Sequence, residues 1–185
     1  MKSTKQLHQP IIDLCKKNNA KAQMQLYNLY CNAMLNVAYR YVKDRFIAED
    51  IMQNAFIKAF KHIDSYKNEV AFGAWLKRIV INQSIDYLKQ KKLDLVAINE
   101  EVTTVTEENN WNIETELSTD EIVEKIYQLK EKYKLVLSLY LLEGYDHQEI
   151  ASILNITENT SRTHLLRGKK ILKEQLKQSS YAAGY

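Results

Sequence analysis

Hydrogen-bonding and cationic side chains are concentrated in one short stretch near the C-terminus. Between Ser161 and Lys177, six Lys or Arg residues accompany one acidic residue, so this stretch carries a charge of +5. Cationic side chains attract phosphates, and polar side chains near the start of a helix can reach base edges in the major groove of DNA. The candidate contacts are Thr160, Arg162, Thr163, His164, Arg167, Lys169 and Lys170. A solvated basic helix at a domain end is the alternative interpretation.

The residues just before this stretch have the parts of a helix-turn-helix motif. Such a motif needs a small residue where its helices touch, a turn residue that tolerates positive φ, and apolar residues between the helices. Ala151 and Asn155 supply the first two, and Thr157 is a suitable N-cap for the second helix. The apolar residues are Ile150, Leu154, Ile156 and Leu165. The second helix is predicted from about Glu158 to Gln178.

The overall composition favours an all-α protein. The 185 residues are 45% hydrophobic and include one proline and four glycines, which is enough for one good core or two small ones. Cys15 and Cys31 match neither a metal site nor a disulfide scaffold. The chain also has no signal-peptide pattern and no apolar run long enough to cross a bilayer. We expect a cytoplasmic protein without membrane insertion.

The charge is divided unevenly along the chain. The formal net charge is +3, but residues 93–119 contain seven acidic residues and no Lys or Arg, which leaves +10 on the rest. This segment is rich in Thr and Asn and lacks periodicity, so it is predicted to be a flexible linker. The expected organisation is an N-terminal extension (1–23), a front domain (24–92), the linker (93–119), a rear domain (120–178) and a tail (179–185).

Three amphipathic helices are predicted in the front domain. Apolar residues recur at helical spacing from Leu26 to Tyr41, from Ile51 to Ile63 and from Phe72 to Leu88. Such stripes can close a bundle of three to four helices. The second of these helices has a polar outer face with one exposed isoleucine. That face contains Asp50, Gln53, Asn54 and Ile57.

The third helix has a polar face that follows an aromatic and basic loop. Arg78, Asn82, Asp86 and Lys89 lie at i, i+4, i+8 and i+11, and Tyr66, Lys67 and Asn68 lie in the loop before the helix. Aromatic rings beside positive charge form platforms on which unpaired bases stack, worth about 1–3 kcal/mol per base. A solvated helix face with an Asp86–Lys89 pair is the alternative, and Phe72 and Trp75 are expected to pack in the core.

Two motif blocks resemble a bacterial sigma factor of the extracytoplasmic-function class. EDIMQNAFIKAFKHIDSY and FGAWLKRIVINQSIDYLKQKK look like sigma region 2, and the helix-turn-helix looks like sigma region 4. The blocks occur in the family's order around the acidic segment, and the resemblance extends from about residue 24 to 176. In the family pattern FxxWLxxIxxNxxxDxxR, Lys89 replaces the final arginine. The resemblance implies two small helical domains, region 2 and region 4, joined by the linker.

The resemblance also implies roles for the candidate residues. The face that contains Asp50, Gln53, Asn54 and Ile57 would dock on core RNA polymerase. The loop and third helix would read the −10 promoter element through Tyr66, Lys67, Asn68, Arg78, Asn82, Asp86 and Lys89. The rear domain would read the −35 element through the contacts from Thr160 to Lys170. The implied partners are core RNA polymerase, promoter DNA and an anti-sigma factor, with no cofactor or metal.

Two residues depart from the region 4 pattern. Ser161 stands where such motifs usually have an apolar residue, so its hydroxyl is expected to weaken the packing. Gly168 replaces the usual alanine, and a glycine inside a helix costs about 1 kcal/mol relative to alanine unless a close backbone approach requires it.

Two other classes of protein fit the sequence less well. A stand-alone helix-turn-helix regulator would explain the rear domain but would leave the Asp50 face and the FGAWLKRIVINQSID block without a purpose. An enzyme is disfavoured because the four histidines form no HExxH cluster and no phosphate-cradling GxxxxGK occurs.

Overall fold

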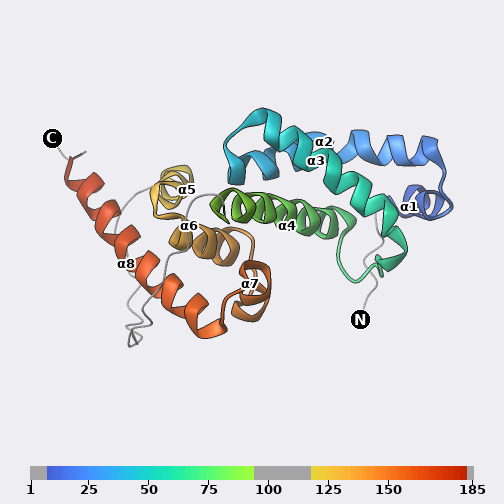
Figure 1. Ribbon diagram of the computed structural model, residues 1–185. Helices are drawn as coiled ribbons and strands as arrows, with labels where there is room; N and C mark the ends of the chain where they lie inside the picture. Colours follow the sequence, from blue (N-terminus) through green and yellow to red (C-terminus); the bar gives the residue numbers. More distant parts are fainter. Residues whose placement is uncertain (1–7, 94–117, 183–185) are drawn as a thin grey trace. The chain divides into compact units, whose positions relative to one another are not determined.

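The computed structural model describes residues 8–93 and 118–182, and every regular element in these ranges is helical (Figure 1). The chain divides into two compact units, Met1–Ile98 and Asn99–Tyr185. The predicted all-α fold is therefore confirmed. The expected linker lies almost entirely outside the described residues. Within the described ranges, no helix is long and apolar enough to cross a membrane.

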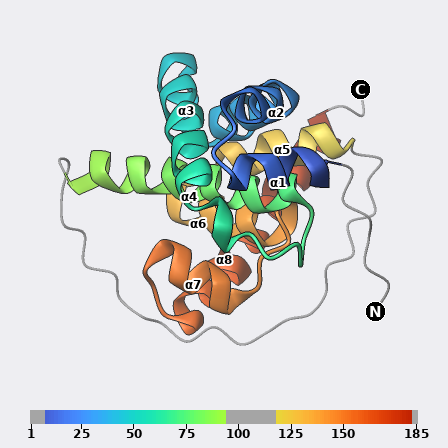
Figure 2. The ribbon, with the colours of Figure 1, turned by 90° about the vertical axis from the view of Figure 1, so that its right-hand side faces the viewer.

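The first unit is a bundle in which α2, α3 and α4 pack against one another and α1 packs on α2 (Figure 2). A short 3-10 turn, η1, follows α3. The bounds are α1 Gln9–Lys16, α2 Ala20–Val42, α3 Arg45–Lys61, η1 Ile63–Ser65 and α4 Phe72–Leu93.

Local capping explains where these helices begin and end. The Asn19 side chain accepts a hydrogen bond from the backbone N–H of Ala22 at 3.0 Å, which caps α2. Lys43 ends α2 in the left-handed conformation at φ 57°. The Asp44 carboxylate then accepts from the N–H groups of Phe46 and Ile47, which caps α3. Capping residues satisfy backbone donors that have no partner inside the helix. Together these caps separate α2 from α3.

The N-terminal boundary differs from the expectation. Residues 1–23 are expected to be an N-terminal extension outside the front domain, but Gln9–Lys16 form α1, whose Ile12 and Cys15 are fully buried. In addition, α2 begins at Ala20, so a boundary at residue 24 falls inside this helix. An eight-residue helix is unstable by itself. Packing of α1 against α2 therefore stabilises it.

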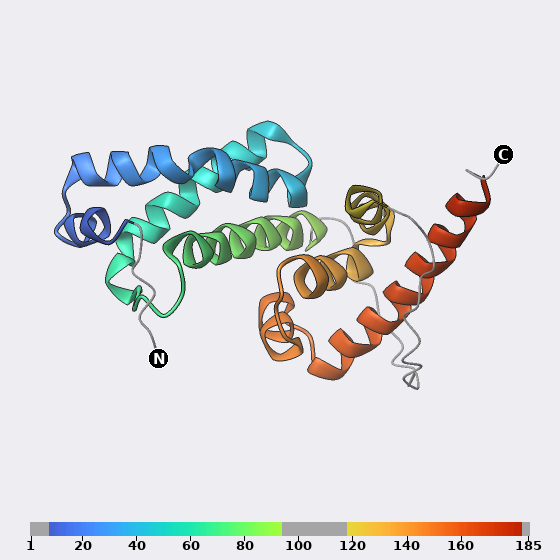
Figure 3. The ribbon, with the colours of Figure 1, turned by 180° about the vertical axis from the view of Figure 1, so that it is seen from behind.

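The second unit is built around a long C-terminal helix. Helices α5, α6 and α7 each contact α8, and Figure 3 shows α6 beside it. A π-helical turn, η2, continues α6. The bounds are α5 Thr119–Gln128, α6 Glu131–Leu137, η2 Ser138–Leu142, α7 His147–Leu154 and α8 Glu158–Ala182.

Capping boxes define two helix starts in this unit. Ser118 and Glu121 exchange hydrogen bonds at the start of α5, and Asp146 and Glu149 do the same at the start of α7. Gly144, at φ 75°, supplies the left-handed turn before α7. These local signals set the starts of α5 and α7.

Gly168 lies where α8 packs closely against α6. A Cβ atom at this position would lie 2.5 Å from Leu137 Cδ1 and 3.2 Å from Tyr133 Cβ. Leu137 is fully buried, so its side chain has little room to move. The exception foreseen for Gly168 therefore applies, because a close helix approach requires glycine here.

We predict that Gly168→Ala lowers stability. Alanine gains about 1 kcal/mol of helix propensity, but overpacking a core costs about 1–3 kcal/mol. The expected net loss is about 1 kcal/mol, which lowers the Tm by roughly 4–8 °C. Thermal unfolding followed by circular dichroism measures this shift. In a Leu137→Ala background the same change should cost less, because the space is open. An equal cost in both backgrounds would contradict the proposed clash.

Candidate nucleic-acid interface

The turn between α7 and α8 has the geometry of a helix-turn-helix. Asn155 ends α7 in the left-handed conformation at φ 56°, ψ 50°, and the N–H of Ile156 donates to the Ala151 carbonyl at 3.1 Å. The Thr157 hydroxyl accepts from the N–H of Thr160 at 3.1 Å. Asparagine enters the left-handed region at low cost, and threonine is a good N-cap. The predicted roles of Asn155 and Thr157 are confirmed.

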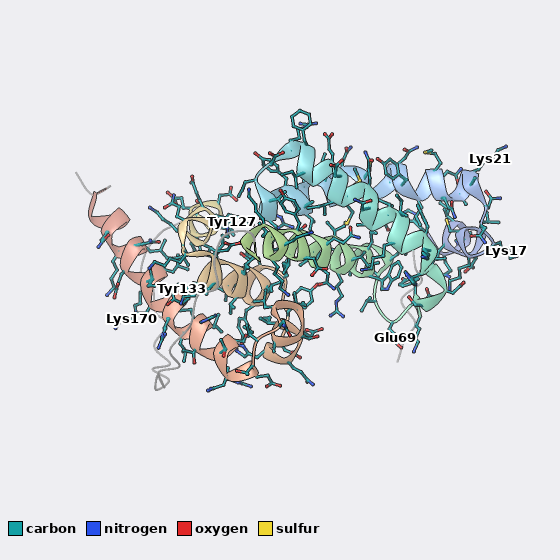
Figure 4. The ribbon with its side chains drawn as sticks, viewed as in Figure 1. Lys17, Lys21, Glu69, Tyr127, Tyr133 and Lys170 are labelled. Atoms are coloured by element: carbon teal, nitrogen blue, oxygen red, sulfur yellow. The ribbon has the colours of Figure 1, made fainter. Side chains whose placement is uncertain are left out.

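Most of the residues expected to read the −35 element reach the surface of α8. Arg162 and Lys170 are exposed, and Figure 4 shows Lys170 projecting outward. Arg162 Nη2 lies 3.6 Å from Glu158 Oε2, and both side chains are about half exposed, so the pair is weak. The other surface candidates are half-buried, and they are Thr160, Thr163, Arg167 and Lys169.

His164 does not fit the expected role. Its side chain is only 6% exposed and packs edge-on against the Tyr133 ring of α6, with 5.7 Å between ring centroids. A side chain in this position cannot reach a base edge. The helical spacing explains the error, because His164 follows Ser161 by three residues and lies on the same buried side of α8.

Ser161 is buried and has a hydrogen-bond partner, which offsets the expected weakening of the packing. Its side chain is fully buried, and its Oγ lies 2.9 Å from Nδ1 of His147, the first residue of α7. A buried hydroxyl is costly only when it lacks a partner. This hydrogen bond joins the two helices of the motif at a position where an apolar residue is expected.

His147 lies in an environment that disfavours its protonation. Its ring stacks on Tyr140 of η2, with centroids 5.0 Å apart, and Lys169 Nζ lies 5.7 Å from the centre of the same Tyr140 ring. Burial is the main cause that lowers the pKa of His147, and the positive charges of Arg162 and Lys169 lower it further. Asp146 and Glu158 act in the opposite direction.

We predict that His147 titrates below the ordinary histidine pKa of about 6.5. NMR titration of the full chain measures this midpoint, with His147→Gln used for assignment. The unfolded chain binds the proton more readily than the folded chain. The contribution of neutral His147 to the free energy of unfolding is therefore fully present above about pH 6.5. It is lost as the pH falls through the pKa of His147 in the folded chain. A midpoint at or above 6.5 would contradict this environment.

The outer face of α3 carries all four residues expected to dock on polymerase. Asp50, Gln53, Asn54 and Ile57 are exposed, and Ile57 is 66% exposed. The structure adds Phe46, which is 82% exposed one helical turn before Asp50. The i, i+4, i+7 spacing of Phe46, Asp50 and Gln53 could have identified it from sequence. Large exposed apolar side chains beside polar ones are typical of a protein-binding surface.

The α4 face and its preceding loop are mostly exposed as expected. Arg78, Asn82 and Asp86 are exposed and Lys89 is half-buried. In the loop, Lys67 and Asn68 are exposed, and Asn68 is in the left-handed conformation at φ 60°.

Tyr66 is the exception in this loop. It is 2% exposed, and its Oη donates to the Val70 carbonyl at 2.7 Å. Its ring contacts those of Phe72 and Trp75, each with centroids 5.4 Å away, and burial raises its pKa. The expected stacking of a base on Tyr66 is therefore wrong, because the ring is already covered. Tyr66 instead holds the loop that presents Lys67 and Asn68.

A groove between α3 and α4 was missed by the sequence reasoning. Its volume is about 520 Å³, and its lining includes Lys58, Lys61 and His62 from α3 and its C-cap, with Gln83, Tyr87 and Gln90 from α4. Periodicity within one helix does not reveal which residues of two helices meet. Among the described residues, no group of His, Cys, Asp and Glu side chains could hold a metal ion.

The two helical units, one with a helix-turn-helix and one with a polar helix face, define a DNA-binding protein of bipartite construction. Residues 26–93 match the family model of sigma-70 region 2, and residues 119–172 match that of sigma-70 region 4. The chain belongs to the sigma factors of RNA polymerase, and specifically to the extracytoplasmic-function class. Sigma factors act in transcription initiation.

Relatives in this class cover nearly the whole chain. The chain is 33% identical over 174 residues to the ECF RNA polymerase sigma factor SigW of Bacillus subtilis (strain 168), covering 88% of this chain and 92% of that one. It is 27% identical over 180 residues to the ECF RNA polymerase sigma-E factor of Haemophilus influenzae, covering 91% and 94%. The sigma factor RpoE of Bartonella quintana, solved with the anti-sigma factor NepR, has a similar fold, with a TM-score of 0.52, 20% identity, and coverage of 83% and 96%.

Proposed function

We propose that this sigma factor docks on core RNA polymerase through the outer face of α3 and recognises two promoter elements. The loop before α4 and the exposed face of α4 bind the −10 element, and the surface of α8 binds the −35 element. The observation that carries this proposal is the helix-turn-helix geometry at Asn155, together with an exposed polar face of α4 in a separate unit.

The proposed residues are those that reach the surface. For polymerase they are Phe46, Asp50, Gln53, Asn54 and Ile57. For the −10 element they are Lys67, Asn68, Arg78, Asn82, Asp86 and Lys89. For the −35 element they are Thr160, Arg162, Thr163, Arg167, Lys169 and Lys170. Burial removes Tyr66 and His164 from the set.

In this proposal the protein contributes binding free energy and catalyses no reaction. Unstacking a DNA duplex costs about 1.4 kcal/mol per base-pair step, and contacts to the displaced strand offset that cost. Asparagine offers both a donor and an acceptor to exposed base edges, as at Asn82, and Asp86 accepts from an amino group. The polymerase catalyses nucleotide joining. In this proposal both proteins act in the cytoplasm.

An anti-sigma factor is the third proposed partner. The sigma factor RpoE of Bartonella quintana was solved in complex with one. The first unit of this chain has exposed apolar side chains in addition to Phe46 and Ile57, such as Met24 and Leu29. An inhibitor that covers such side chains would hold the sigma factor away from polymerase.

Run-off transcription tests the central proposal. Purified bacterial core RNA polymerase is incubated with DNA from upstream of this gene, with and without the protein. We expect discrete transcripts that require the protein and that are strongly reduced by Asp50→Ala/Gln53→Ala, because the docking face is lost. Lys17→Ala/Lys21→Ala is a control on exposed lysines of the same unit. Tight duplex binding by the protein alone, with no transcript, would instead favour a stand-alone regulator.

The −35 contact of Arg162 can be tested separately. We predict that Arg162→Ala weakens promoter binding by the reconstituted holoenzyme, measured by gel shift at several salt concentrations. A loss that shrinks as the salt concentration rises, with a shallower slope of log K against log salt, identifies a phosphate contact, whereas a loss confined to one −35 base pair, of about 1–3 kcal/mol, identifies a base contact. Lys130→Ala, a lysine outside α8, is the control. Unchanged affinity would remove Arg162 from the interface.

A further inference from the structure

The loop between η1 and α4 lies almost entirely at the surface. Every residue from Lys67 to Ala71 is exposed, so these side chains add little packing that could fix the path of the chain. Asn68 is in the left-handed conformation at φ 60°, and Glu69, labelled in Figure 4, follows it. Segments with few buried contacts open easily unless hydrogen bonds restrain them. The directions of Lys67 and Asn68 therefore depend on how the loop is anchored.

Tyr66 is the buried anchor at the start of this loop. Its N–H donates to the Ile63 carbonyl at 3.1 Å, and its hydroxyl donates to the Val70 carbonyl at 2.7 Å. The Tyr66 carbonyl accepts a hydrogen bond of 3.2 Å from the ammonium of Lys16, which lies 50 positions earlier in the chain. All three polar groups of Tyr66 are thus bonded, and one of these bonds comes from another helix.

The bond from Lys16 acts on the peptide group that leads into Lys67. A peptide group is planar, so the Tyr66 carbonyl and the Lys67 N–H turn together. A donor that fixes this carbonyl also fixes the ψ angle of Tyr66, which is 110°, and with it the direction in which the chain continues. Lys67 and Asn68 are the residues of this loop that are proposed to contact the −10 element. The Lys16 ammonium thereby controls where they point.

The packing of α1 brings Lys16 to the loop. Lys16 is the last residue of α1, whose Ile12 and Cys15 are fully buried, and α1 contacts both α2 and η1. Lys16 itself is half-buried, whereas Lys17, the next residue, is exposed. Within residues 8–93 and 118–182, no ion pair involves Lys16. Because no carboxylate competes for the ammonium there, it is left to form a charge-assisted hydrogen bond to the carbonyl, which is stronger than a neutral one.

We propose that Lys16 is a positioning residue for recognition of the −10 element. It holds the Tyr66–Lys67 peptide group, so that Lys67 and Asn68 meet the exposed promoter strand in a fixed arrangement. This inference rests on the proposed function and gives α1 a part in it. A direct contact between Lys16 and a DNA phosphate is the alternative. The structure favours positioning, because the half-buried ammonium already donates to a carbonyl and the exposed Lys17 and Lys67 are more accessible to phosphates.

The selectivity of the reconstituted holoenzyme for the −10 element tests this role. Run-off transcription is compared on the native promoter, on a template with a substituted −10 element and on one with a substituted −35 element. We expect Lys16→Met to lower the preference for the native −10 element about three- to tenfold, the effect of losing one hydrogen bond. The preference for the native −35 element should not change. Lys16→Arg, which can also donate to a carbonyl, should recover most of the preference.

Two further variants make the test specific. Lys17→Met is the matched control, because it removes the same charge from the next residue, labelled in Figure 4, and should leave the selectivity as in the wild type. In a Lys67→Ala/Asn68→Ala background, Lys16→Met should have no further effect, since the side chains that Lys16 positions are absent. Circular dichroism melts and the −35 preference confirm that each variant is folded and active.

Three results would overturn the inference. One is wild-type −10 selectivity in Lys16→Met, and another is an equal loss in Lys17→Met. The third is a loss of equal size on all templates, with a shallower slope of log K against log salt in gel shifts, which would identify a phosphate contact. Failure of the proposed function is a different result. In that case Lys67→Ala/Asn68→Ala would leave the −10 selectivity of the holoenzyme unchanged.

Discussion

The close approach of α8 to α6 at Gly168 determines which residues of α8 reach the surface that is proposed to bind DNA. A Cβ atom here would lie 2.5 Å from Leu137, so glycine is needed although it costs helix stability. The contact fixes the rotation of α8 about its own axis. Ser161, His164, Leu165, Gly168, Leu172 and Leu176 all lie on the buried side as a result. The basic side chains between them are turned outward, where phosphates can reach them.

Both departures from the region 4 pattern belong to this buried side. Gly168 permits the close approach, and Ser161 replaces an apolar contact with a hydrogen bond to His147 across the helix-turn-helix. The ring of His147 in turn stacks on Tyr140 of the π-helical turn. Polar and aromatic contacts thus link η2, α7 and α8 around the recognition helix. Such a network has a more specific geometry than apolar packing, because a hydrogen bond restricts both distance and direction.

In the first unit, aromatic packing rigidifies the loop that precedes α4. Tyr66 contacts Phe72 and Trp75, and its hydroxyl bonds to Val70 within the same loop. The Lys16 ammonium of α1 donates to the Tyr66 carbonyl at 3.2 Å, so the N-terminal helix also holds the loop. A promoter strand would therefore meet a preformed surface, and less conformational entropy would be lost on binding.

Local signals in the sequence were sufficient for α3, α4 and α8 and for the turn at Asn155, because capping and left-handed residues act over three or four positions. The exposed faces of α3 and α4 also followed from helical spacing. Tertiary packing decided which polar residues are buried: Tyr66 and His164 have ordinary surface chemistry but face a neighbouring helix. The groove between α3 and α4 and the need for glycine at residue 168 likewise depend on contacts between helices far apart in the chain. Periodicity within one helix carries no information about the distance to another.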